Sequence, residues 1–473
     1  MAEDPLGGAD DDFREMLRRF LAGEGDLDPS QLAGAAGLPT DPLMVARLMA
    51  QLQKAMNASG DGVNGVTGID WQLAKDEAGR IAAQGSIRSS AAELEQLRQA
   101  LNVAALWLDE ATSITQLTSE PTLLTRADWV RLTLPVWTQL AEPVATSIAD
   151  SLTEVLDQQI PEELKGMVAN AGQMMRSLGG TLFSLQLGHV VGQLAAEVVS
   201  GGDIGIPLLP GRDDTDVQAA LIPQNMATFA TGLDIPTDQV QLYLAVRELA
   251  HARLFRHARW LRQHLISAIT DYARGIRIDT DRIESLAAEF DPANPESLRE
   301  ALTSGALIPP KTEAQDAALG RLETTLALIE GWVDVVTAQA TSRLPKADAV
   351  AETVRRRRAS GGPAESAFST LVGLELRPRR LREAAVFWQR ITEAVGSDVR
   401  DGLWAHPDLL PVADDIDDPT RVIAALQGGG ASEPDALDQA LSELLADESG
   451  DRPIEGAPGE TPDEPNQPSE PIA

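Results

Sequence analysis

The stretch VRELAHARLFRHARWLRQHL, residues 246–265, carries the strongest indication of fold and chemistry in this chain. Its core, RELAH at residues 247–251, differs at one position from the HExxH pattern. In that pattern two histidines one helical turn apart bind zinc, and the glutamate activates a bound water as general base. Arg247 stands where the first histidine would be, so the residue that is missing is a metal ligand.

Helical geometry decides which side chains can share this site. At about 100° per residue, Arg247 and His251 lie within about 40° of each other, and Glu248 lies about 60° from His251. His257 and His264 project from other faces, by well over 100°, and stand roughly 10 Å from each other. Glu248 and His251 therefore hold the base and second-ligand positions, and any third ligand must come from another part of the chain.

The best remote candidate lies in LALIEGWVDVV, residues 326–336. Glu330 and Asp334 are one helical turn apart there, as a ligand carboxylate and an outer carboxylate that orients a ligating histidine would be. The apolar residues around them predict that at least one carboxylate lies near a packed interface. The other two histidines fit ordinary structural positions, since His189 is expected in the core and His406 at a turn.

Composition and charge exclude several classes of function. The formal net charge of −33 argues against nucleic acid or an anionic membrane as the main partner. The absence of cysteine excludes disulfides, thiolate catalysis and cysteine-ligated zinc. Residues 166–199 imitate a membrane span, but charged and polar residues interrupt every apolar run of roughly 20 residues. With no signal peptide visible at the N-terminus, the cytoplasm is the expected location.

The chain divides into three parts by pattern and composition. The pattern of residues 1–65 predicts an N-terminal segment with a short amphipathic helix and a Gly-rich linker. Residues 66–427 show mostly 3.6-residue periodicity, which predicts a mainly α domain, and GGDIGIPLLPG at 201–211 is the clearest extended connection. Residues 428–473 are rich in Gly, Pro, Glu, Asp and Ser, which predicts a disordered acidic tail.

Glycines at positions 180, 188 and 192 lie within the apolar stretch of residues 166–199. Glycine on a helix face lets a second helix approach closely. We therefore expect these three glycines to mark a tight helix crossing within a buried core.

A resemblance to a known family covers most of residues 65–425. The chain resembles the actinobacterial zincin-like metallopeptidases, described as hydrolases or zinc-dependent metalloproteases, one sister branch of which is linked to deazaflavin coenzyme biosynthesis. It rests on the stretches LGGTLFSLQLGHVVGQLAAEVVSGGDIGIPLLP, YLAVRELAHARLFRHARWLRQHL, IEGWVDVV, STLVGLELRPRRLREAAVFW and LWAHPDLLP. The resemblance implies a helical zincin-like fold, with Glu248 as the catalytic base and His251 and Glu330 as zinc ligands. Arg247 is the departure from the family pattern.

Two functions stay open on these residues. The first is a zinc-dependent hydrolase with a degenerate site, weakly active or inactive, because two protein ligands are fewer than the three usual in catalytic zinc sites. The second is a non-catalytic scaffold that binds a peptide or protein partner. There the guanidinium of Arg247, charged at any ordinary pH, replaces the metal and bridges Glu248 and Glu330. Zinc follows from the resemblance alone.

Two basic clusters stand out in this acidic chain, RRRR at residues 355–358 and LRPRRLR at residues 376–382. No RNA-binding aromatic motif accompanies them, so no nucleic-acid partner is expected. They predict either a solvated helix face or a contact with acidic groups elsewhere in the chain. The acidic tail, residues 428–473, could shield them loosely, or it could remain free in solvent.

Overall fold

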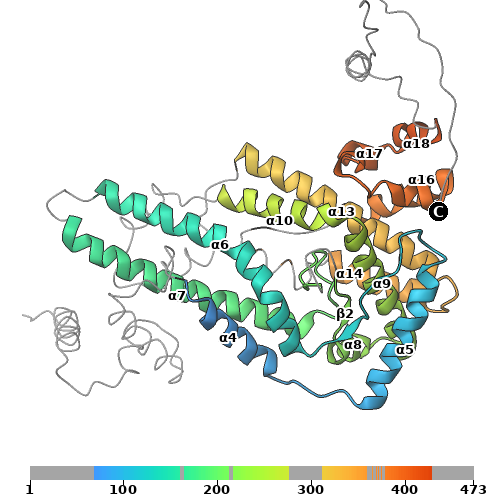
Figure 1. Ribbon diagram of the computed structural model, residues 1–473, viewed down its shortest axis with the longest axis horizontal. Helices are drawn as coiled ribbons and strands as arrows, with labels where there is room; N and C mark the ends of the chain where they lie inside the picture. Colours follow the sequence, from blue (N-terminus) through green and yellow to red (C-terminus); the bar gives the residue numbers. More distant parts are fainter. Residues whose placement is uncertain are drawn as a thin grey trace, which may run out of the picture.

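The computed structural model describes residues 69–159, 165–211, 217–275, 312–359 and 379–428, with the single positions 365, 369, 371 and 374. The predicted N-terminal amphipathic helix and nearly all of the predicted acidic tail lie outside these residues. Within them the fold is mainly α-helical, as the periodicity predicted (Figure 1). None of the described helices has the length and apolarity needed to cross a membrane.

The helices follow one another along the chain with two very short strands between them. They are α4 (Trp71–Ala83), α5 (Ala91–Leu108), α6 (Arg126–Gln159), α7 (Lys165–Glu197), α8 (Pro223–Ala230), α9 (Thr237–His257), α10 (Arg259–Arg274), α13 (Glu313–Ala340), α14 (Ala347–Ala359), α16 (Leu381–Gly402), α17 (Ala413–Asp417) and α18 (Thr420–Gln427). The strands β1 (Thr122–Leu123) and β2 (Ala220–Leu221) pair in parallel. A 3-10 turn covers Pro407–Leu409.

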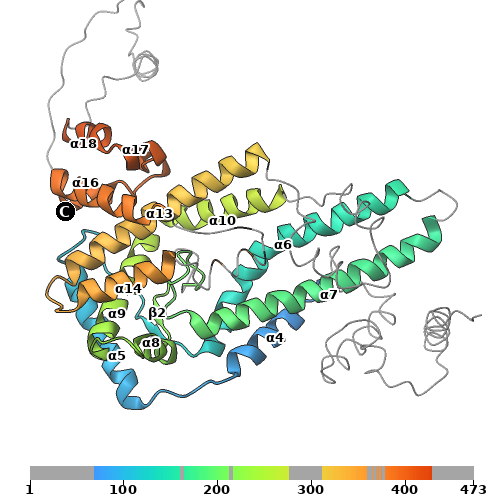
Figure 2. The ribbon, with the colours of Figure 1, turned by 180° about the vertical axis from the view of Figure 1, so that it is seen from behind.

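An arm of long helices extends to one side of the molecule. The helices α6 and α7 run side by side along it, and α4 packs against α7 (Figures 1 and 2). Glycines make the α4–α7 crossing close: a Cβ on Gly188 would lie 2.5 Å from the Ala74 carbonyl oxygen, and one on Gly192 would lie 2.7 Å from Ile81 Cβ. The predicted tight crossing is therefore confirmed at these two glycines.

The helices α9 and α13 lie at the centre of the other part of the molecule. Residues on almost every face of the middle of α9 are buried, because α5, α13, α14 and α8 all pack against it. The helix α13 starts at a capping box, in which Thr312 and Gln315 exchange hydrogen bonds. On its far side α13 packs on α16, and Gly331 allows the backbone at Ala384 to approach. The candidate site therefore lies between two buried helices.

The segment after α7 crosses over α9. Residues 199–201 run beside β2, where Gly201 N–H donates to the Ala220 carbonyl at 2.9 Å and Ile222 N–H donates to the Val199 carbonyl at 2.9 Å. The following residues turn, and then run without helix toward Pro210. We call residues 199–211 the covering loop. It is the segment that the sequence predicted as an extended connection, although it begins with turns.

Candidate functional site

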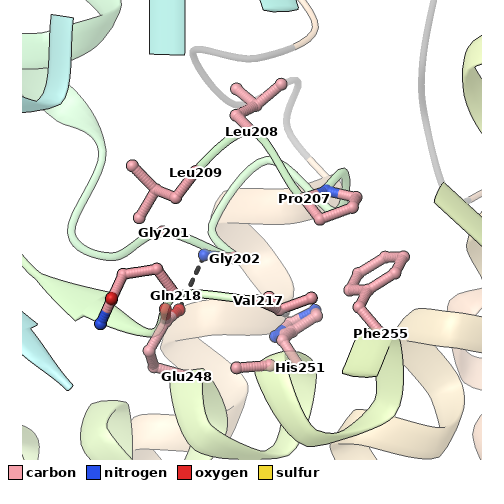
Figure 3. Close-up of a pocket in the computed structure, with 11 residues that line it drawn as sticks. Gly201, Gly202, Pro207, Leu208, Leu209, Val217, Gln218, Glu248, His251 and Phe255 are labelled. Carbon is pink, nitrogen blue, oxygen red and sulfur yellow. Dashed lines mark hydrogen bonds between the residues drawn. The ribbon is translucent and has the colours of Figure 1, made fainter. Parts of the chain in front are cut away.

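Three side chains of the RELAH stretch face the interior at the middle of α9. Arg247, Glu248 and His251 are all buried. Glu248 and His251 project from α9 toward the covering loop (Figure 3). The helical spacing that placed them on neighbouring faces is confirmed.

Glu330, on α13, is the acceptor at which the site converges. Its side chain is 1% exposed. Arg247 donates from Nη2 to Oε2 of Glu330, and His251 Nε2 lies 3.1 Å from Oε1. A third side chain, Arg358 at the end of α14, donates from Nη2 to the same Oε1. The structure thus brings together Arg247, His251 and Glu330, as the sequence predicted, and adds Arg358, which it did not predict.

Glu248 is held by backbone N–H groups. Its Oε2 accepts a hydrogen bond from Gly202 N–H at 2.7 Å, and its Oε1 accepts one from Ala220 N–H at 2.8 Å. Burial raises the pKa of Glu248, and these hydrogen bonds oppose that rise. The hypothesis that Arg247 bridges Glu248 and Glu330 is therefore right for Glu330 and wrong for Glu248, because the covering loop and β2 already supply the donors.

Asp334 lies one turn after Glu330 on α13 but does not contact a histidine. Arg355 of α14 donates to it twice from Nε, and from Nη2 at 2.8 Å. The Nδ1 atom of His251 lies 3.2 Å from the Arg247 carbonyl oxygen instead. The prediction that Asp334 orients a ligating histidine is wrong. The Nδ1 atom of His251 contacts a backbone carbonyl of α9, and Asp334 is paired with Arg355.

Three glycines let the covering loop touch the site. A Cβ on Gly201 would lie 2.8 Å from Glu248 Oε1, and one on Gly202 would lie 2.8 Å from His251 Cβ. Gly205 has a φ of +84°, and its Cβ would lie 3.0 Å from Glu330 Oε1. Sequence reasoning missed these positions, although three glycines within five residues directly after an apolar helix were a visible signal.

The arginine run at residues 355–358 is mostly turned inward. Arg357 pairs with Asp203 of the covering loop at 3.0 Å and also donates to the Glu197 carbonyl at the end of α7. Burial by itself raises the pKa of Asp203, but Arg357, Arg358, the Val199 N–H and Arg247 together outweigh it and lower the pKa. Arg356 alone points outward, with its side chain 77% exposed beside Glu352. Of the two predicted alternatives, contact with acidic groups of the chain holds for Arg355, Arg357 and Arg358.

A small, half-open pocket lies over His251; its empty volume of about 240 Å3 includes open solvent, and the enclosed part has room for about one water molecule. Its walls are mostly apolar, and Glu248, His251 and Gln218 supply the polar groups (Figure 3). The apolar lining includes Pro207, Leu208, Leu209, Val217 and Phe255.

The remaining histidines take no part in the site. His264 makes an edge contact with the Trp260 ring at 5.7 Å, on α10. His406 caps the turn at Pro407–Leu409, which confirms its predicted place. His189 is exposed on α7, so the prediction that it lies in the core is wrong. The glycine face of α7 turns toward α4, which leaves the neighbouring position at the surface.

The donor atoms at the site can be compared with the needs of a zinc ion. Burial, together with Arg247 and Arg358, lowers the pKa of His251 to about 3, so the ring is neutral, as a ligand must be. Two ligand atoms of a tetrahedral zinc lie about 3.4 Å apart, close to the 3.1 Å between His251 Nε2 and Glu330 Oε1.

The other atoms at the site do not fit zinc. Both oxygens of Glu330 accept from guanidinium groups, and both oxygens of Glu248 accept from the backbone. Burial lowers the pKa of Arg358 to about 9, which still leaves it positively charged at neutral pH. Among the described residues, no group of three or more His, Asp or Glu side chains is arranged to hold a metal ion. The site therefore places two guanidinium cations around Glu330, the expected zinc ligand.

Comparison with known proteins places this geometry in a family context. A family model described as zincin-like metallopeptidase matches residues 69–423. The structure described as "Crystal structure of a putative hydrolase with a novel fold from Chloroflexus aurantiacus" is similar, with a TM-score of 0.53 and 18% sequence identity. The match covers 76% of this chain and 100% of that one, and at this identity it shows a shared fold alone. No curated protein matches the chain.

Proposed function

This chain belongs to the zincin-like metallopeptidase family, and we propose that it is a metal-free member: a non-catalytic, zincin-derived scaffold that binds a peptide or protein partner. One observation carries the proposal. Glu330, the expected zinc ligand, has both carboxylate oxygens occupied by guanidinium donors, including that of Arg247 at the first ligand position. A guanidinium keeps its charge at any ordinary pH, so it repels a metal cation and offers no lone pair.

The retained carboxylates then have structural roles. Glu330 is buried, and an unpaired buried carboxylate would be costly, so the arginines keep it compatible with the core. Glu248 ties the covering loop and β2 to α9 through two backbone N–H groups. Each oxygen of Glu248 accepts one backbone N–H and keeps its other lone pair, but without a metal-bound water the residue has no catalytic task in this proposal.

The pocket over His251 is the place where a partner would contact the former active site. Its mostly apolar wall would contact an apolar side chain of a peptide laid across the opening, and Gln218 adds a polar group. The covering loop forms one side of this pocket, from Gly201 to Leu209. A partner would therefore contact the same loop that Glu248 anchors.

A weak zinc-dependent hydrolase is the second candidate. The observation that favours it is the 3.1 Å separation of His251 Nε2 and Glu330 Oε1, with Glu248 on the same helix. This function requires the guanidinium groups of Arg247 and Arg358 to leave Glu330 before a metal could bind.

Metal content separates the two candidates. The full chain, purified without a histidine tag, is incubated with zinc, desalted and analysed by mass spectrometry for metals. We expect far less than one zinc per chain, and no peptidase activity that a chelator abolishes. Stoichiometric zinc that is lost in a His251→Ala variant would overturn the scaffold proposal in favour of the hydrolase.

A further inference from the structure

Arg358 reaches the site from a helix that the RELAH stretch does not include. The side chain is 11% exposed and donates from Nη2 to Oε1 of Glu330. Arg247 donates to the other oxygen, Oε2. The two guanidinium groups therefore divide the carboxylate between them, one oxygen each.

The charges at the site match those of a metal centre. A zinc ion held by two neutral histidines and one glutamate gives a local charge of about +1, from +2 and −1. Arg247, Arg358 and Glu330 give the same sum, from two single positive charges and one negative charge. A single arginine opposite Glu330 would leave the site neutral. The second arginine makes the replacement equal in charge to the ion.

Neighbouring contacts hold Arg358 in this position. Arg355, one turn earlier on α14, pairs with Asp334 at 2.8 Å, and Arg357 pairs with Asp203 of the covering loop. A Cβ on Gly205 would lie 3.4 Å from Arg358 Nη2, so the loop closes directly over the guanidinium. The helix α14 is thus fastened both to α13 and to the loop that covers the site.

We propose that Arg358 is the second half of a two-guanidinium replacement for the divalent cation, and that α14 delivers it as a built-in occupant of the metal position. The inference rests on the proposed function and deepens it. If the chain is changed back toward a zinc-binding site, Arg247→His restores the missing ligand but leaves Arg358 hydrogen-bonded to Glu330. Recovery of a zinc site therefore requires changes at both positions.

Zinc affinity of four full-length proteins tests this. These are the wild type, the single variant Arg247→His (R247H), and two double variants in which R247H is combined with Arg358→Gln (R247H/R358Q) or with Arg356→Gln (R247H/R356Q). Zinc is titrated against a chromophoric chelator, and circular dichroism checks the fold. We expect R247H/R358Q to bind zinc about tenfold or more tightly than R247H alone, the size of effect seen when groups around a metal ligand change.

Arg356 is the matched control, since it belongs to the same run but faces solvent beside Glu352. R247H/R356Q should bind zinc as R247H does. His251→Ala introduced into R247H/R358Q should remove the gain, which shows that the zinc is in this site. If R247H binds zinc as tightly as R247H/R358Q, the role of Arg358 is overturned, while the scaffold proposal stands or falls on the wild type alone.

A stability cycle covers the case in which the double variant does not fold. Thermal unfolding is compared for R358Q, Glu330→Gln and their combination, with R356Q as the control. We expect R358Q to lower Tm more than R356Q, and the combination to lose less than the sum of the single changes. Strictly additive losses, or an R358Q protein as stable as R356Q, would show that Arg358 does not act on Glu330.

Discussion

Glu248 joins three parts of the chain through one carboxylate. Its oxygens accept from Gly202 in the covering loop and from Ala220 at the start of β2, while its backbone belongs to α9. Both donor residues are buried, so their N–H groups would not be hydrogen-bonded by solvent if Glu248 were absent. Glu248 therefore has a structural role in the fold, whatever its role in chemistry.

Replacement of Glu248 by alanine should destabilise the protein. It leaves two buried N–H groups without acceptors, which costs about 2 kcal/mol or more. Urea unfolding of Glu248→Ala measures this loss, and Glu383→Ala, at an exposed position on α16, is the control. Equal midpoints for the two variants would mean that the Glu248 hydrogen bonds contribute nothing to stability.

His251 should make the stability of the protein sensitive to mild acid. Its pKa in the folded protein is lowered to about 3, first by burial and then by Arg247 and Arg358, whereas an unfolded histidine titrates near 6.5. Between these values the unfolded state binds more protons, so stability falls as the pH falls from about 6.5 toward 3. At pH 5 this contribution amounts to a loss of about 2 kcal/mol.

The comparison of two glutamine variants isolates this effect. His251→Gln should lose less stability than the wild type between pH 7.5 and pH 5, as followed by urea unfolding at each pH. His257→Gln, at an exposed position near the end of α9, should behave as the wild type does. An identical pH dependence for wild type and His251→Gln would exclude a neutral buried His251.

At the scale of the element, helical periodicity explains why some arginines of the run at residues 355–358 face α13 and another faces solvent. On α14, Arg355 and Arg358 lie about 60° apart, whereas Arg356 lies about 160° from Arg358. The first pair therefore faces α13, where Asp334 and Glu330 lie one turn apart at matching positions. Arg356 is left to solvent for the same reason.

Close approach of α4 and α7 should depend on the glycines of α7. In Gly188→Ala the new methyl group would meet the Ala74 carbonyl and Glu77 Cβ at 2.5 and 2.8 Å. The helices must then move apart, at a cost of about 1–3 kcal/mol. Thermal unfolding measures the loss.

The matched control for this substitution is Gly320→Ala. Gly320 lies in α13 with nothing within 4 Å of an added Cβ, and alanine there should stabilise the helix by about 1 kcal/mol. Opposite changes in Tm are thus expected for the same chemical substitution. If both variants gain stability, the α4–α7 crossing is looser than the structure describes.

At the scale of the whole molecule, one buried carboxylate connects distant parts of the chain. Asp401, at the end of α16, accepts from Trp332 Nε1 of α13 at 2.9 Å and from Arg400 Nε at 2.7 Å. It also accepts from Thr112 and Ser113, which follow α5. These contacts hold α13, and with it Glu330, at a defined distance from the α5 region.

Loss of the Asp401 charge should weaken this whole assembly. Asp401→Asn leaves the fully buried Arg400 without its anion, at a cost of about 3 kcal/mol or more. Trp332 and Trp404 lie beside it, so tryptophan fluorescence during urea unfolding reports the change. Asp398→Asn, exposed on the same helix, should leave the midpoint unchanged; an equal fall in both variants would contradict the assigned role of Asp401.

The sequence by itself determined the mainly helical fold, the neighbouring faces of Arg247, Glu248 and His251 on one helix, and the choice of Glu330 as the partner of Arg247 and His251. They follow from the 3.6-residue period and from motif resemblance, and both signals can be read within short stretches of consecutive residues. A close helix crossing at the glycines of α7 could be predicted for the same reason, whereas its partner, α4, could not.

Only the tertiary structure decided which donor each carboxylate receives. Arg358 on Glu330, Arg355 on Asp334, and the backbone N–H groups on Glu248 all come from segments separated from their acceptors in the chain. A hydrogen bond is set by a few tenths of an ångström and by direction, which depend on how whole helices pack and not on the spacing within one of them. Burial then made these pairings obligatory, because each carboxylate had to find donors within reach once water was excluded.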